Sequence, residues 1–281
     1  MTGPVPPLFD RRAYGHRRDR AVRLKGDAFL AREAAAGLAH RLAAVNRKFT
    51  LALDLESNPG AGDELHPLAE TWERASIGPD ETLGVSPGRY DLIVSVLSLH
   101  TVNDLPGVLA QIRQALKPDG LFLAALFGGS TLIEMRQSFA AAESEISGGI
   151  SPRVSTFADV RDLGSLLQRA GFALPVADVE RTIVRYPNVS KLISDLRAMG
   201  ETNVLVERRK GFTTRKLLLA TCAKYYAQFS DPDNRLRATF EIAYLTGWSP
   251  HESQQQPLKP GSAKMRLADA LGTAEHPLKR D

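Results

Sequence analysis

An acidic side chain, Asp54, lies near the end of a short apolar run, and a cofactor could bind at the segment that follows it. Residues 49–55 are apolar enough for one buried parallel strand. Ligands of open α/β sheets bind at the carboxyl ends of such strands. A loop that cradles a cofactor there needs early glycines, because the backbone must turn sharply and come close to the ligand. Here polar residues come first and glycines late, in the order Glu56, Ser57, Asn58, Gly60 and Gly62. The strand is typical of a nucleotide-binding sheet, and the loop is not.

Three further side chains could take part in catalysis. His100 ends the clearest apolar strand of the chain, residues 90–100, where an imidazole can accept a proton. Glu134 and Arg136 fall on the first helix after a pair of glycines, at the expected substrate entrance, where they could meet a guanidinium and a carboxylate respectively. Simpler roles are open for all three, namely a histidine bonded to backbone at a strand end and a surface ion pair.

Alternating strands and helices place these residues at one edge of a sheet. Residues 50–55, 71–77, 90–100 and 121–127 are predicted strands, and residues 105–116 form a helix that a proline and a glycine terminate. Strand, helix and strand in short succession indicate a parallel sheet with right-handed crossovers. A long basic helix is predicted before the sheet, at residues 19–45. The second half continues with predicted helices at 131–146, 159–170, 189–199 and 216–229 and strands at 179–186 and 238–248.

Composition excludes several classes of protein. The 281-residue chain is 43% hydrophobic and has no apolar run long enough to cross a membrane. No apolar signal-peptide core follows Met1, so we expect the cytoplasm. Residues 10–48 hold eleven Lys or Arg against four acids, which is either the solvated side of covering helices or a face for an acidic partner or an anionic membrane. Aromatic residues are not interleaved there, which argues against nucleic acid. The single Cys222 excludes a multi-cysteine metal site, and His251 with Glu252 lacks the second histidine of a metalloprotease helix, so no metal site is predicted.

Several segments, in this order, resemble class I S-adenosylmethionine-dependent methyltransferases. They are LFDR (8–11), LALDL (51–55), YDLIVSVLSLH (90–100), VNDLP (102–106) and LKPDG (116–120). More narrowly, the chain is similar to the assembly-factor methyltransferases of respiratory complex I, which are relatives of the biotin-pathway carrier-protein methyltransferases. That likeness rests on FGGSTLIEMR (127–136), DLGSLLQRAGF (162–172), MGETN (199–203) and GWSPHESQ (247–254).

The resemblance implies an α/β fold with a mostly parallel, Rossmann-like sheet flanked by helices, a protein partner from a respiratory complex, and S-adenosylmethionine as the cofactor if one is bound. Matched residue by residue, it implies that Asp54 is the acid of the first strand and that Asp80 or Glu81 is the acid facing adenine. Cofactor and substrate would meet at Ser95, Leu97 and His100. The chain then divides into a basic helical segment (1–48), a methyltransferase-like core (49–175), a completion of the sheet with helical insertions for substrate or partner (176–256) and a flexible tail (257–281).

The cofactor half departs from the family pattern in two ways. Glu56 and Asn58 hold early glycine positions, where a positive φ would be strained. Only 34 residues separate Leu55 from Tyr90, and a crossover with its helix needs at least about 10 to 12 residues. We therefore expect one strand-helix unit to be missing. Because the strand at 71–77 with its following acids matches the family's third strand, the missing unit is predicted to be the second strand, its ribose-binding acid and the next helix.

Three functions stay open on this sequence. The first is a partner-binding protein that keeps the methyltransferase fold but binds the cofactor weakly or not at all, in effect a pseudoenzyme that acts as an assembly chaperone. The second is an active methyltransferase in which Gly60 and Gly62 replace the early glycines. The third is another enzyme, including one that hydroxylates a protein arginine. The substrate half keeps its family-like segments more fully than the cofactor half, which favours partner binding.

Overall fold

The structure is a computed structural model that describes residues 6–58, 61–255, 265, 269 and 271–273. It divides into a compact unit that ends at Pro250 and a second unit that begins at His251. Each is considered by itself, and the features described below belong to the first. The tail predicted at 257–281 lies largely outside the described residues, and so does Gly60.

A six-stranded sheet in the order β2-β1-β3-β4-β6-β5 is the centre of the described chain. Strands β1 to β4 pair in parallel, and β6 runs antiparallel to both β4 and β5. The bounds are Leu51–Leu55 (β1), Thr71–Ala75 (β2), Tyr90–Val96 (β3), Leu116–Phe127 (β4), Ala173–Tyr186 (β5) and Leu236–Trp248 (β6). Every residue of β3 is buried, including Asp91 and Ser95, as its richness in branched apolar residues predicts. The predicted α/β class with a mostly parallel sheet is confirmed.

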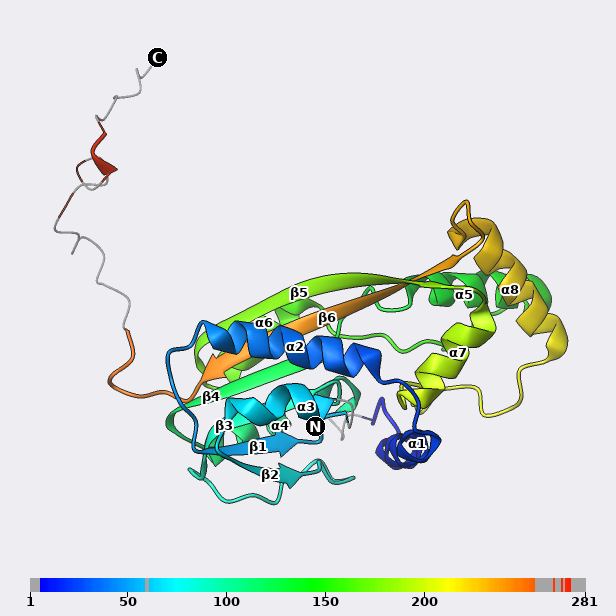
Figure 1. Cartoon of the computed structure of the whole chain (residues 1–281). Coiled ribbons are helices and arrows are strands. Elements are labelled where there is room, and N and C mark those ends of the chain that lie inside the picture. Colours follow the sequence, from blue (N-terminus) through cyan, green and yellow to red (C-terminus); the bar gives the residue numbers. More distant parts are fainter. Residues whose placement is uncertain (1–5, 59–60, 256–264, 266–268, 270, 274–281) are drawn as a thin grey trace, which may run out of the picture. The chain divides into compact units, whose positions relative to one another are not determined.

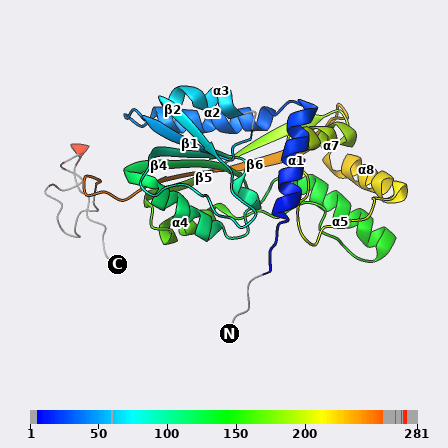
Figure 2. The ribbon, with the colours of Figure 1, turned by 90° about the horizontal axis from the view of Figure 1, so that it is seen from below.

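Helices cover both faces of this sheet, as Figure 2 shows for α2 and α3 above it and α4 below it. One apolar cluster joins α2 to the sheet, and a second joins α4 and α6 to its other face. The remaining helices gather near one end of the strands (Figure 1). The bounds are Arg11–Leu24 (α1), Phe29–Ala43 (α2), Gly62–Leu65 (α3), Leu105–Ala115 (α4), Ile133–Ser147 (α5), Val160–Arg169 (α6), Val189–Ala198 (α7) and Arg215–Phe229 (α8).

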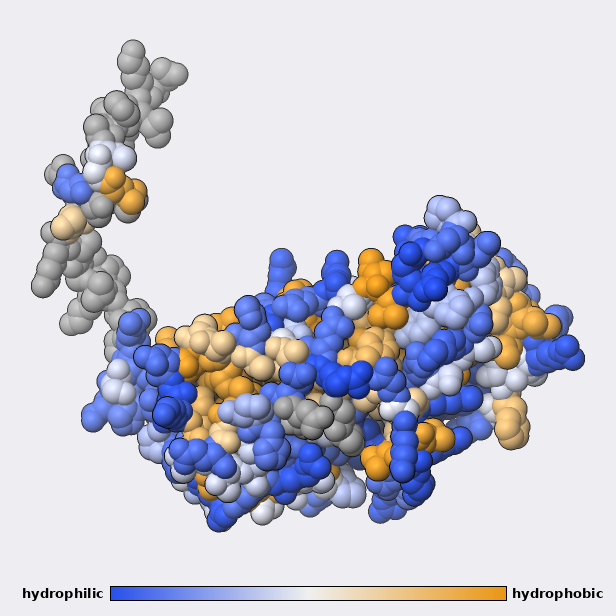
Figure 3. Space-filling model, viewed as in Figure 1, coloured by the Kyte–Doolittle hydropathy of each residue, from blue (hydrophilic) through white to orange (hydrophobic). Residues whose placement is uncertain are grey.

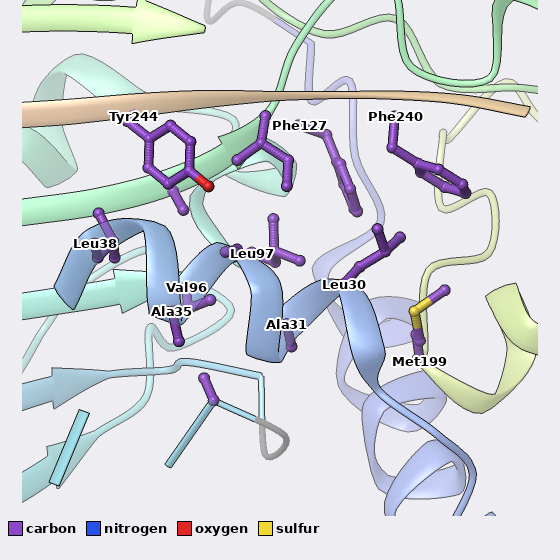
Figure 4. Packing of buried hydrophobic residues seen from close by; sticks show 14 of the residues in the cluster. Leu30, Ala31, Ala35, Leu38, Val96, Leu97, Phe127, Met199, Phe240 and Tyr244 are labelled. Carbon is purple, nitrogen blue, oxygen red and sulfur yellow. The ribbon is translucent and has the colours of Figure 1, made fainter. Parts of the chain in front are cut away.

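Helix α2 packs on the sheet through small and branched apolar side chains. Leu30, Ala31, Ala35 and Leu38 are at most 1% exposed and face the sheet in Figure 4. Fully burying one such leucine contributes about 1.5–3 kcal/mol.

On the face shown in Figure 3, hydrophilic residues predominate and hydrophobic residues form separate patches, one of them over α8.

The helix predicted at 19–45 is wrong, because the structure has two helices there. Lys25 adopts a left-handed conformation with φ 47°, and it ends α1. The backbone at Gly26 passes so close to α7 that an added Cβ would overlap the Cβ of Ala198. A glycine therefore occupies the turn between α1 and α2. Local helical periodicity carries no information about this tertiary contact.

A strand is missing, but not where the sequence placed the gap. Residues 71–75 pair directly with β1, from Leu51 against Thr71 to Leu55 against Ala75. In sheets of this topology the second strand is the neighbour of the first. The strand at 71–77 therefore lies in the second strand's position, and the expected third position beyond it is not filled by any described residue. Among the described residues, the connection from β1 to β2 contains the short α3 and the 3-10 turn His66–Leu68, and no further strand.

The close packing of α2 on β6 yields a stability prediction. At Gly37 an added Cβ would lie 2.7 Å from Cζ of Tyr244, closer than packed atoms approach. Gly37→Ala should lower the free energy of unfolding by about 1–3 kcal/mol through overpacking. Gly15→Ala in α1 is the matched control, because nothing lies within 4 Å of its added Cβ. That change should raise stability by up to about 1 kcal/mol through helix propensity. Urea unfolding of both variants would contradict this packing if Gly37→Ala were as stable as Gly15→Ala.

Candidate functional site

Helix α1 lies across the sheet edge at which a fold of this type binds its ligand. The parallel strands β1 to β3 end at this edge, and Figure 1 shows α1 beyond the tips of β1 and β2. Asn103, after β3, holds the segment before α1 by two hydrogen bonds to the backbone of Phe9. Asp10 then caps the helix by accepting a hydrogen bond from the amide of Ala13. The N-terminal segment is thus fixed over the candidate cofactor edge.

Arg11 of α1 is buried at this edge and contacts the segments that follow three strands. Its guanidinium donates to Oε2 of Glu56 at 2.9 Å, to the carbonyl of Ile77 at 3.0 Å and to Oγ1 of Thr101 at 3.0 Å. These residues follow β1, β2 and β3 respectively. The side chain of Arg11 is 5% exposed and that of Glu56 16% exposed. A buried guanidinium is tolerated only with such partners.

Glu56 keeps the backbone conformation that a glycine would adopt. Its φ is 53°, and Asn58 has no positive φ, so the strain predicted for both positions falls on Glu56 alone. Its amide donates to the carbonyl of Ala75, its carbonyl accepts from Arg18, and its carboxylate accepts from Arg11 and from the amide of Ile77. A non-glycine residue at such a φ persists where its surroundings over-determine it.

The remaining polar groups after β1 also have internal partners. Asp54 accepts hydrogen bonds from Nε and Nη2 of Arg74 and from the amide of Ser57. The hydroxyl of Ser57 accepts from the amide of Val96, and Asn58 donates to the carbonyl of Met199. The loop therefore folds back against β3 and the end of α7. Gly62 begins α3, and Gly60 lies outside the described residues.

The predicted positions after β2 and β3 are similarly engaged. Glu81 is 8% exposed and accepts hydrogen bonds from the amides of Asn103 and Asp104 and from the side chain of Asn103. Asp80 is exposed and accepts from Thr82. The Ser95 hydroxyl lies 2.7 Å from that of Ser98. Leu97 has φ 51°, and its carbonyl accepts from Tyr14 and Arg18 of α1. The structure thus brings the cofactor-side residues to one edge, but residues of α1, β2 and the neighbouring loops hydrogen-bond their polar groups.

A pocket of about 660 Å³ lies beside this edge, between the sheet and the helices of the second half. Its apolar wall includes Phe127, Met135, Phe157 and Phe240. Of the candidate residues named above, His100 lines it and the cofactor-side residues do not. The volume is in the range of small-molecule sites. This pocket therefore adjoins His100 and not the residues predicted to bind the cofactor.

His100 sits in the wall of this pocket with one ring nitrogen unpaired. Its side chain is 2% exposed, and Nε2 lies 3.1 Å from Oε2 of Glu201. Nδ1 has no hydrogen-bond partner in the described part of the chain. The ring contacts Phe127 and Phe157, with centroids 4.9 and 5.3 Å away. Such a histidine, oriented by a carboxylate and facing a pocket, has the arrangement of a proton acceptor.

Glu134 and Arg136 both lie on α5, but their side chains bind other parts of the chain and do not face the large pocket. Glu134 is 6% exposed and accepts hydrogen bonds from the amide and hydroxyl of Thr239 on β6. Arg136 donates to the backbone carbonyls of Gly129, Thr131 and Ser155. Neither is among the residues that line the large pocket. Their contacts tie α5 to β6 and to the loop before α6.

A second buried ion pair holds Arg153 at the pocket wall. Nε and Nη2 of Arg153 donate to Oε1 of Glu143, at 2.7 and 2.6 Å, and Ser151 donates to the same carboxylate. The side chains of Glu143 and Arg153 are 3% and 11% exposed. Burial alone would raise the pKa of Glu143, but hydrogen bonds from Ser151 and Arg153 outweigh it and lower that pKa.

Several of these residues were not singled out from the sequence. Arg11 and Arg18 belong to the basic segment expected to be solvated or to face a partner, yet both side chains are largely buried. Their burial follows from tertiary packing and has no local signal. Glu201 lies inside the family-like MGETN segment, and that segment was the available signal for it.

No group of three or more His, Cys, Asp or Glu side chains among the described residues is arranged to hold a metal ion. None of the helices in the described part of the chain has the length and apolar character needed to cross a membrane.

Comparison with known proteins places this geometry in a family. Residues 9–175 match the protein family described as "Methyltransferase domain". Arginine-hydroxylase NDUFAF5, mitochondrial, from Danio rerio is 37% identical, with 93% of this chain and 89% of that protein covered. The protein of that name from Dictyostelium discoideum is 44% identical over 72% of this chain, and the match spans 46% of its length. Malonyl-[acyl-carrier protein] O-methyltransferase from Xylella fastidiosa is 40% identical over 62% of this chain and 56% of its own.

Solved structures agree on the fold alone. A Bacillus halodurans protein described as a methyltransferase superposes with a TM-score of 0.51 at 14% identity, covering 77% of this chain and 99% of that one. The YcgJ protein of Bacillus subtilis superposes with a TM-score of 0.50 at 10% identity, covering 78% and 99%. At these identities the likeness supports the architecture and no shared activity.

The Glu143 ion pair yields a prediction about stability and pH. Glu143→Gln should lower the free energy of unfolding by about 3 kcal/mol at neutral pH, because Arg153 is left buried without its charge partner. Since the folded-state pKa of Glu143 is lowered, its contribution is present above the unfolded pKa and is lost as pH falls through the folded pKa. The two proteins should therefore converge in stability below the ordinary carboxyl range.

The control for this prediction is on the same helix. Glu145 pairs with Lys224, but its side chain is 60% exposed. Glu145→Gln should change stability by no more than about 0.5 kcal/mol. Thermal unfolding over a pH series measures all three proteins, and equal losses in Glu143→Gln and Glu145→Gln would contradict the assignment.

Proposed function

The chain belongs to the methyltransferase-domain family and is similar to the arginine-hydroxylase NDUFAF5 proteins, and from this we propose that it acts on or chaperones a protein partner. In this proposal its binding of S-adenosylmethionine is impaired or absent. The partner class follows from the resemblance to complex I assembly factors, which points to a respiratory complex subunit. The expected cytoplasmic location stays a prediction, since the names of the NDUFAF5 relatives place those proteins in mitochondria.

One observation carries this proposal. The buried guanidinium of Arg11 is bound to Glu56, Ile77 and Thr101, at the strand ends where the family resemblance places the cofactor. The positively charged sulfonium of the cofactor would have to displace the Arg11 guanidinium or lie beside it. Two positive charges in contact repel each other. The arrangement argues against cofactor binding here.

The other implied contacts support the same conclusion. Asp54 is engaged by Arg74, and Glu81 by Asn103 and Asp104, so neither carboxylate is free for a ribose or an adenine. Asp80 alone is exposed, and a single acid supplies little affinity. The residues as arranged do not fit the cofactor, and we derive no reaction step through it. An active methyltransferase would need α1 and the loop after β1 to move.

The second candidate is hydroxylation of a partner's arginine, a two-electron oxidation whose oxygen atom and oxidant would come from co-substrates and not from this chain. It is favoured by the names of relatives 37–38% identical over most of this chain and by the placement of Glu201. Oε1 of Glu201 has no hydrogen-bond partner among the described residues, although Nη1 of Arg18 lies 3.5 Å from it. A carboxylate with spare acceptor capacity in a pocket can receive a guanidinium. Glu201 is therefore the residue we assign to that substrate.

Titration with cofactor tests the first proposal. Isothermal calorimetry with S-adenosylmethionine and S-adenosylhomocysteine should show no binding heat, because internal partners occupy the site. A ligand present at about 100 times its Kd would stabilise the fold by about 2.7 kcal/mol, so a thermal-shift assay checks the result independently. Asp80→Ala is the control variant, because Asp80 is exposed and its change should not unfold the chain. Micromolar binding that Asp80→Ala abolishes would overturn the proposal.

Peptide mass spectrometry tests the second candidate. In the native host, deletion of the gene should remove an arginine-containing peptide heavier by one oxygen atom, and the intact gene should restore it. Glu201→Gln should fail to restore it, because a neutral amide does not pair with a guanidinium as a carboxylate does. Glu145→Gln, the same chemical change at a glutamate that is 60% exposed on α5, should restore it. An unchanged set of arginine peptides after deletion would exclude this candidate and leave a chaperone role.

A further inference from the structure

The mouth of the 660 Å³ pocket carries an unbalanced positive charge. Seven lining residues are Arg or Lys and one is acidic, Glu201. Three of the seven are satisfied internally: Arg153 by Glu143, Arg208 by Asp10, and Arg17 by the carbonyl of Asn203. The other four are exposed, and their side chains have no hydrogen-bond or ion-pair partner among the described residues: Arg20, Arg197, Arg209 and Lys210.

These four cations come from three elements that meet at the pocket. Arg20 is on α1 and Arg197 on α7, two helices that pack together, while Arg209 and Lys210 lie in the loop before α8. Below them the wall is apolar and aromatic. Burial, and then the neighbouring Arg208, lower the pKa of Arg17, as expected where cations crowd. The site is therefore cationic at its rim and apolar in its depth.

An exposed aromatic residue adjoins this rim. Phe212 is 98% exposed, and it lies in sequence between Lys210 and Thr213, which both line the pocket. A fully exposed phenylalanine is typical of a contact with a protein partner rather than with a small ion. The chain's own tail does not complement the rim, because residues 257–281 hold five Lys or Arg and three acids.

We propose that this pocket and its rim bind an acidic segment of the partner protein, with an apolar side chain against the Phe127 and Phe157 wall and flanking carboxylates on Arg20, Arg197, Arg209 and Lys210. The inference rests on the proposed function, since it names the chemistry of the partner. The rim charges would speed encounter and set the register, and the aromatic wall would supply most of the buried area.

The test uses the full chain and two labelled peptides of about ten residues, a length within reach of one pocket and its rim. One alternates Leu and Glu around a central Phe, and its counterpart has Lys in place of each Glu. By fluorescence anisotropy the acidic peptide should bind, less tightly as salt rises, and the basic peptide should not. Equal binding of both peptides would overturn the inference.

Charge-reversal variants locate the binding. Arg197→Glu combined with Arg209→Glu should weaken the acidic peptide at least about tenfold, because two attractive contacts become repulsive. The matched control is Arg161→Glu combined with Arg169→Glu, which makes the same change in net charge at exposed positions of α6 that do not line the pocket. Similar weakening by both pairs would mean a general charge effect and would refute the site. Phe212→Ser should weaken binding without changing the melting temperature.

A membrane surface is the competing occupant. If phosphatidylserine vesicles bind and the rim variants abolish that binding while peptide binding is unchanged, the rim is a lipid contact and the inference is wrong. Failure of peptide binding with no heat from S-adenosylmethionine would remove this inference and leave the proposed function standing. Cofactor binding would overturn the proposed function instead, and the two failures are thus distinguishable.

Discussion

The buried guanidinium of Arg11 is the constraint on which the candidate site depends. Moving such a cation out of water costs several kcal/mol unless it is paired and fully hydrogen-bonded. Glu56, Ile77 and Thr101 supply those bonds, and they follow three different strands. One side chain thus holds the segments after β1, β2 and β3 together and fixes α1 across them. It also accounts for the positive φ of Glu56, because the ion pair and backbone bonds keep that residue where a glycine would otherwise be needed.

Because of this constraint, the segments after β1, β2 and β3 are bonded to one another through Arg11, and we call this region the filled edge. The pocket beside it, which His100 and Glu201 line, is the hollow edge. At the filled edge the polar groups of Asp54, Glu56 and Glu81 are all satisfied by the chain itself. At the hollow edge, Nδ1 of His100 and Oε1 of Glu201 make no hydrogen bond within the described part of the chain, although Arg18 lies 3.5 Å from that Glu201 oxygen. Polar groups left unpaired in a buried wall cost stability, and they are retained where a ligand or reaction uses them. We therefore expect the function to depend on the pocket that His100 and Glu201 line.

Family membership leaves that function open, because one fold serves many activities. A relative that matches 93% of this chain is named arginine-hydroxylase, and one that matches 62% of it is a carrier-protein methyltransferase. The charges at the pocket indicate which groups of a partner could bind to its wall and which to its rim. A guanidinium would find a single acid, Glu201, in the wall, whereas carboxylates would meet unpaired cations at the rim. A partner segment with an arginine among acidic residues would satisfy both.

The sequence by itself determined the elements that carry their own local signals. The apolar run of β3, the Asp104 cap of α4 and the glycine after α5 specify structure through hydrophobic burial and backbone hydrogen bonding over a few residues. Tertiary structure alone decided the break of the N-terminal helix at Lys25, the pairing of β2 with β1 and the burial of Arg11 and Arg18. Each of these depends on residues far apart in the chain, such as Ala198 against Gly26 or Glu56 against Arg11. Local periodicity cannot report a charge's burial, because burial is a property of what packs over it.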